Sequence, residues 1–103
     1  MTGIYIEVDG GRVLVTAQGH ATGSDNMCGA ISGILYALAG FVHNKEREGT
    51  ATIYTFRDKP GDFALHCDGD NDLLTAVEMT TIGLQQLEQA EPELIRVEFP
   101  ENL

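Results

Sequence analysis

The chain has 103 residues and a mass of 11.1 kDa, which is enough for one hydrophobic core, so we expect a single domain over residues 1–103. Sixteen acidic against six basic residues give a formal net charge of -10. A charge of this sign repels phosphate backbones and anionic lipid, so the composition argues against nucleic acid and membranes as direct partners.

Cysteine content and the N-terminal segment indicate the compartment. Cys28 and Cys67 are too few for the disulfide framework of a small secreted protein, so both are expected to be thiols. Residues 1–10 lack the basic and apolar regions of a signal peptide, and no apolar run approaches the roughly 18 residues of a membrane span. We therefore expect a cytoplasmic protein.

The first half of the chain predicts a hairpin followed by a helix. Apolar residues alternate over residues 3–8 and again over Arg12–Gln18, and the Asp9-Gly10-Gly11 sequence between them is typical of a tight turn. Apolar residues then recur at helical spacing from about Asn26 to His43. Three glycines inside this helix predict a close approach of neighbouring backbone; they are Gly29, Gly33 and Gly40.

The second half predicts another hairpin, a helix and a final strand. The strands are expected over residues 51–57 and 62–67, the helix from about residue 72 to 88, and the last strand over residues 94–99. Met27 and Met79 are interpreted as core residues. The element order ββαββαβ predicts an α+β fold, with a single sheet of about five strands and two helices packed on it.

The loop before the first helix carries the candidate site. Asp25 is predicted as the helix N-cap, which would place Cys28 at the third helical position. The N–H groups and positive dipole at a helix start favour the thiolate form of a cysteine there, and they could also stabilise an oxyanion. This position therefore suits a nucleophilic cysteine.

A histidine lies within reach of that thiol. His20 ends the second strand, and the seven-residue loop that follows it can fold back to bring the imidazole to Cys28. The residues alone therefore allow a Cys/His dyad, although an inert, buried cysteine fits the same pattern.

Other polar residues have two interpretations each. Ser32, one helical turn after Cys28, either supports the site or bonds back to the Cys28 carbonyl, and Asp25 either caps the helix or orients His20. Acidic residues before the second helix lack the glycine and glutamate of a calcium loop, so they predict a helix cap and no metal site; they are Asp68, Asp70 and Asp72.

The segment around His20 and Cys28 resembles the signature of the Prp family of ribosomal-processing cysteine proteases. In that family a Gly-His pair ends a strand, a glycine follows, an aspartate precedes the cysteine by three residues, and a Cys-Ala-Ala-Val-Ser-like sequence begins a helix. The corresponding positions here are Gly19, His20, Gly23, Asp25, Cys28 and Ser32. The similarity in element order covers nearly the whole chain, and Pro92 to Val97 resembles the last strand of the family.

The resemblance implies an endopeptidase with Cys28 as nucleophile and His20 as base, no cofactor, and a homodimeric state. Its substrate would be the N-terminal extension of a large-subunit ribosomal protein in Firmicute-type bacteria, or a phage head protein with a similar site, cleaved after a hydrophobic, phenylalanine-containing segment. The loop between His20 and Cys28 is shorter here than in the family. A non-catalytic Prp-like binding or assembly module is therefore the alternative, and a different thiol enzyme such as an amidase is a third interpretation.

Overall fold

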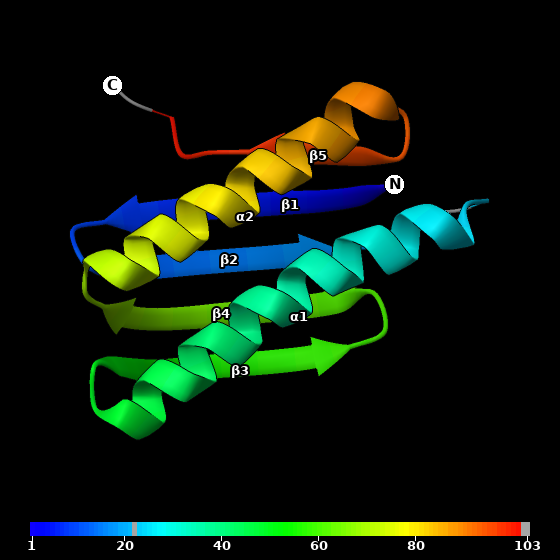
Figure 1. Ribbon diagram of the computed structural model, residues 1–103. Helices are drawn as coiled ribbons and strands as arrows, with labels where there is room; N and C mark the ends of the chain where they lie inside the picture. The colour runs from blue at the N-terminus through cyan, green and yellow to red at the C-terminus, as the bar shows by residue number, and fades with distance from the viewer. Residues whose placement is uncertain (22, 102–103) are drawn as a thin grey trace.

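A computed structural model describes residues 1–21 and 23–101, and its element order is the predicted ββαββαβ (Figure 1). One five-stranded sheet and two helices make an α+β fold. The elements are β1 (Thr2–Asp9), β2 (Arg12–Gln18), α1 (Asp25–Glu48), β3 (Ala51–Lys59), β4 (Asp62–Gly69), α2 (Asn71–Ala90) and β5 (Ile95–Glu98).

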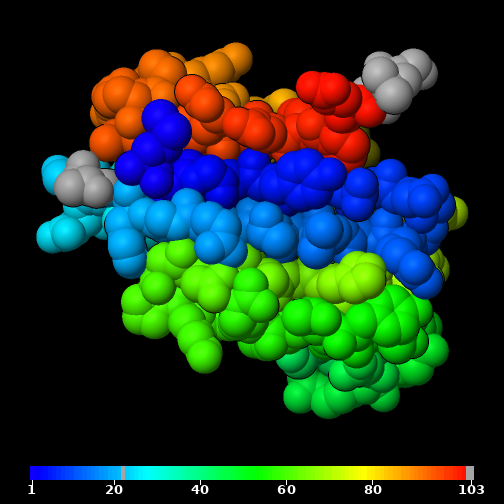
Figure 2. Space-filling view, turned by 180° about the vertical axis from the view of Figure 1, so that it is seen from behind, coloured from blue at the N-terminus to red at the C-terminus, as the bar shows by residue number. Residues whose placement is uncertain are grey.

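The strand order in the sheet is β3-β4-β2-β1-β5. The two hairpins, β1–β2 and β3–β4, join through an antiparallel pairing of β2 with β4, and β5 adds to β1 in parallel. Both helices lie side by side on one face of the sheet (Figure 1), and Figure 2 shows the opposite face, which neither helix covers. Because β2 and β4, the second strands of the two hairpins, run antiparallel, the two hairpin turns lie at opposite ends of the sheet.

The core lies between the helices and the covered face of the sheet. Its largest fully buried side chains come from strands and helices alike, and they are Ile4, Leu65, Leu73, Leu84, Ile95, Val13, Val15, Val42, Val77 and Cys67. The alternation expected in the first two strands is confirmed by the burial of Ile4, Ile6, Val13 and Val15, whereas Val8 near the end of β1 is exposed. Met27 is buried as predicted, whereas Met79 is 74% exposed because it lies on the outer side of α2.

The glycines of α1 do not have the predicted structural reason. A Cβ added at Gly29, Gly33 or Gly40 would meet nothing within 4 Å, because all three lie on the exposed side of the helix. The close approach between the helices occurs instead at Gly83 of α2, where an added Cβ would lie 3.3 Å from Cδ1 of Ile34. The small residues of α1 therefore do not bring the two helices together.

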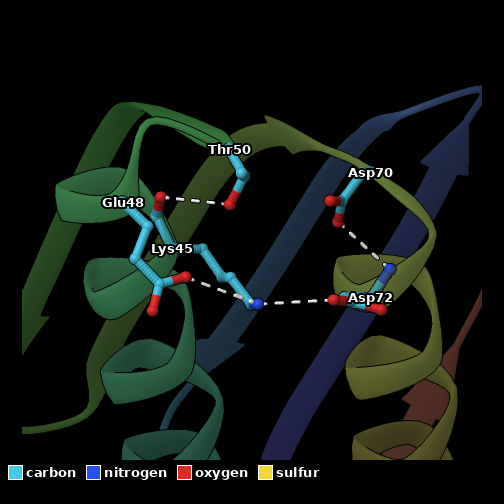
Figure 3. A network of polar contacts seen from close by, with 5 residues as sticks. All are labelled: Lys45, Glu48, Thr50, Asp70 and Asp72. Atoms are coloured by element: carbon cyan, nitrogen blue, oxygen red, sulfur yellow. Dashed lines mark hydrogen bonds and ion pairs between the residues drawn. The ribbon is translucent and has the colours of Figure 1, made fainter.

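A polar network joins the end of α1 to the start of α2 (Figure 3). The Lys45 ammonium lies 3.3 Å from a carboxylate oxygen of Asp72 and 3.5 Å from one of Glu48. The Asp70 carboxylate accepts the Asp72 N–H at 3.1 Å and caps α2, as predicted for this acidic segment. No group of three potential metal ligands occurs in residues 1–21 and 23–101.

By length and composition alone, α1 is apolar enough to cross a membrane, although the chain has no uninterrupted apolar run of that length. Its buried side chains, among them Ile31, Leu35 and Leu38, belong to the core that α1 forms with the sheet. Core helices of soluble proteins pass the same test of length and composition.

Candidate active site

A cavity of about 270 Å³ opens between the first half of α1, the end of β2 and the turn that joins β3 to β4. His20, Cys28 and Ser32 all line it, so three of the predicted site residues meet in one place. Apolar side chains form much of its wall, and they are Ala17, Ile31, Leu35 and Phe63. The arrangement places polar groups beside a surface that suits an apolar side chain.

The N-cap of α1 is Ser24, not Asp25 as predicted. Ser24 has the extended backbone of a cap residue, with φ -143° and ψ 97°, and its hydroxyl accepts the Met27 N–H at 3.1 Å. Asp25 is the first helical residue and is exposed, where its charge still suits the positive end of the helix dipole. Serine and aspartate cap equally well, so their order in the sequence did not distinguish them.

This correction moves Cys28 from the third to the fourth helical position. Its N–H donates to the Ser24 carbonyl at 3.2 Å, which is the first hydrogen bond of the helix. The predicted contribution of helix N–H groups to an oxyanion hole therefore does not extend to the Cys28 N–H itself.

The loop between His20 and Cys28 folds back through two contacts of Ala21. The Ala21 carbonyl accepts the Ser24 N–H at 3.1 Å and lies 3.7 Å from the Sγ of Cys28, which donates to it. The Ala21 side chain is buried. Because His20 directly precedes Ala21, these contacts bring the end of β2 to the start of α1.

The backbone conformation explains Gly23, whereas no local hydrogen bond in the described part of the chain explains Ser32. Gly23 adopts φ +88°, a conformation that L side chains rarely adopt, so glycine is required there for its backbone alone. Ser32 is half-buried and does not bond to the Cys28 carbonyl among the described residues, whereas Thr80 donates to the Ala76 carbonyl at 2.8 Å. The back-bonding alternative for Ser32 is therefore not realised.

Sequence reasoning missed one wall of the cavity. The β3–β4 turn was interpreted only as a connection, yet residues 58–62 line the cavity and Gly61 lies against His20. A Cβ added at Gly61 would lie 2.6 Å from Nε2 of His20. No local signal announces this contact, because it depends on β4 lying next to β2 in the sheet.

The second cysteine lies outside the cavity. Cys67 of β4 is fully buried, and burial, followed in importance by the charge of Asp68, raises the pKa of its thiol to about 11. Its neighbour His66 contacts the Tyr54 ring, with centroids 5.2 Å apart. Neither cysteine forms a disulfide.

Comparison with known proteins gives matches at the level of structure alone. No protein-family model matches the chain, and no curated protein shows significant sequence similarity to it. Among solved structures it is similar to the essential ribosomal processing protease Prp from S. aureus in complex with a covalently linked product peptide, with a TM-score of 0.78 and 20% identity over 97% of this chain and all of that chain.

Two further structures have the same fold. The S. aureus Prp protease in complex with a substrate peptide matches with a TM-score of 0.73 and 19% identity, over 97% of this chain and all of that chain. SMU.848 from Streptococcus mutans matches with a TM-score of 0.69 and 19% identity, over 96% of this chain and 93% of that chain. The chain therefore has the fold of the Prp protease structures, as the resemblance in the His20 to Ser32 segment implied.

Proposed function

We propose that this protein is a cysteine endopeptidase of the Prp type, with Cys28 as nucleophile and His20 as general base. The observation that carries the proposal is the cavity that His20, Cys28 and Ser32 line together, in a fold shared with Prp protease structures that hold peptides. Nucleophilic catalysis by cysteine needs a base within reach of the thiol, and the shared cavity supports such an approach of His20 to Cys28.

The proposed reaction has two steps. In the first, His20 takes the proton of Cys28, the sulfur attacks the peptide carbonyl carbon, and the C–N bond breaks as His20 protonates the departing amine. In the second, His20 takes a proton from water, the resulting hydroxide attacks the thioester, and the thiolate of Cys28 leaves. Ser32 lines the same cavity and has a supporting role in this scheme.

The proposed substrate is the N-terminal segment of a large-subunit ribosomal protein precursor, or of a phage head protein with a similar site. The apolar wall formed by Ile31, Leu35 and Phe63 supports a cleavage site that follows a hydrophobic segment, as the resemblance implies. Cytoplasmic location, homodimer formation and independence of cofactors are further parts of the proposal, and they derive from the sequence and the resemblance.

Mass spectrometry of a ribosomal protein precursor tests the proposal directly. The wild-type protein should remove the N-terminal extension, and the Cys28→Ala variant should leave the precursor intact. Processing by both proteins would contradict the role of Cys28. Processing by neither protein, of the ribosomal precursor and of a phage head protein alike, would contradict the proposed function and favour the non-catalytic alternative.

A further inference from the structure

The turn between β3 and β4 is joined to the end of β2, immediately before His20. Pro60 and Gly61 form its two-residue loop, and Gly61 has the positive φ, +70°, that the third position of a type II turn requires. The Gly61 carbonyl accepts the Gly19 N–H at 2.9 Å. The turn and the residue that precedes His20 are therefore held together by their backbones.

A carboxylate anchors this turn across three strands. The Asp62 carboxylate accepts hydrogen bonds from Nε of Arg57 at 2.7 Å and from Nη2 of Arg57 at 3.0 Å, so two nitrogens of the guanidinium bind its two oxygens. Nε2 of Gln18 donates to the same carboxylate at 2.7 Å. These bonds join β3, β4 and β2 at the end of the sheet that forms the cavity.

The imidazole of His20 lies directly against Gly61. A Cβ built on Gly61 would lie 2.6 Å from Nε2 of His20 and 3.1 Å from both neighbouring ring carbons. Gly10, in the opposite hairpin turn, has a similar φ of +63°, but a Cβ built there would meet nothing within 4 Å. Both turns require glycine for their backbone, and Gly61 alone of the two also makes room for a ring.

From these contacts we propose that the β3–β4 turn positions the imidazole of His20. The ring packs against Gly61, and the hydrogen bonds of Asp62 hold the turn in place. This inference rests on the proposed function for its catalytic meaning. His20 is exposed and lies two residues beyond the end of β2, and the Gly61 contact is made by its ring itself. Proton transfer depends on the orientation of the ring, and a displacement of about 1 Å can lower a rate by on the order of 10²-fold. Gly61 and Asp62 are thus positioning residues and not catalytic ones.

The matched pair Gly61→Ala and Gly10→Ala tests the packing of the His20 ring against Gly61. Both substitutions place a side chain at a positive φ, so both carry similar backbone strain, but only the first adds an atom where the imidazole lies. NMR should detect contacts between the His20 ring protons and Gly61 in the wild type. Gly61→Ala should shift the His20 ring signals and lower the rate of Cys28 alkylation at neutral pH by about tenfold or more, whereas Gly10→Ala should change neither.

The substitution Asp62→Asn tests whether the carboxylate of Asp62 holds the turn in place, with Asp9→Asn in the opposite hairpin as control. The first should shift the His20 ring signals in the same direction as Gly61→Ala, by a smaller amount, and the second should leave them unchanged. Absence of contacts between the His20 ring and Gly61 in the wild type would overturn the inference whether or not any variant folds. Equal effects of the two glycine variants would also overturn it. If the wild type cleaves no precursor but its imidazole still responds to Gly61→Ala, the proposed function fails and the positioning of His20 stands.

Discussion

The two cysteines of this protein have opposite relations to their histidines. Cys28 and His20 are eight residues apart in the chain, yet they line one cavity because the loop between them folds back through Ala21. Cys67 directly follows His66, but successive residues of a strand point to opposite faces, so adjacency in β4 separates the two side chains. The position of Cys28 near the helix start and the course of the preceding loop, and not distance along the sequence, therefore determine which cysteine shares a cavity with a histidine.

The surroundings of the two thiols differ as much as their partners. Cys28 is half-buried and lines a cavity, whereas Cys67 is fully buried in the core, with a pKa raised to about 11. A buried neutral thiol behaves as a small apolar side chain. The comparison assigns a packing role to Cys67 and is consistent with the proposed nucleophilic role of Cys28.

The largest expected effect is a difference in activity between variants of His20 and of His66. His20→Ala should lower kcat/KM for peptide cleavage by about 10²- to 10⁴-fold, because it removes the proposed general base. His66→Ala should leave kcat/KM nearly unchanged, since its side chain alternates with those of the buried Leu65 and Cys67 and its ring contacts that of Tyr54, outside the cavity. Steady-state kinetics with a peptide substrate measures both. Equal losses in the two variants would contradict the assignment of the base.

A second expected difference concerns modification of the native protein by iodoacetamide at pH 7. With a pKa of about 11, only about one in 10⁴ Cys67 thiols would be ionised at that pH, and burial excludes the reagent as well. Peptide mapping should therefore find the label on Cys28 alone. Labelling of both cysteines after unfolding in urea is the control. Labelling of native Cys67 at a rate similar to that of Cys28 would contradict the expected difference in reactivity between the two thiols.

The smallest expected effect is a loss of stability in alkaline solution. Because the folded-state pKa of Cys67 is raised above the ordinary cysteine value of 9.0, the unfolded chain releases this proton at lower pH than the folded one. The free energy of unfolding should fall as the pH rises from 9 to 11, by at most about 3 kcal/mol. Urea unfolding at several pH values measures it, and Cys67→Ala should show a shallower decrease. An identical pH dependence in both proteins would contradict the burial of a neutral thiol.

The order and type of the elements could be predicted from the sequence because their hydrophobic periods are strong and local. Alternation in Ile4 and Ile6, and helical spacing in Leu35, Leu38 and Val42, reflect the burial that the structure confirms. Rotation of a helix about its axis is less well specified, since it depends on the partner surface. For this reason Met79 is exposed and the glycines of α1 face away from the sheet.

The candidate site was predictable only where its residues are close in the chain. His20, Cys28 and Ser32 fall within one loop and one helical turn, and the structure brings them to one cavity. The N-cap assignment failed between two adjacent residues of equal capping ability. The contact of Gly61 with His20 spans 41 residues and depends on the strand order β3-β4-β2, which no local pattern specifies.

The most direct test of the account is to identify the residue that becomes acylated during peptide cleavage. A precursor peptide is mixed with the protein, the reaction is quenched with acid within its first turnover, and the protein is digested and mapped by mass spectrometry. The account predicts a thioester of the N-terminal product on Cys28, absent from Cys28→Ala and strongly reduced in His20→Ala. An adduct on Cys67, or cleavage of the peptide by Cys28→Ala, would contradict it.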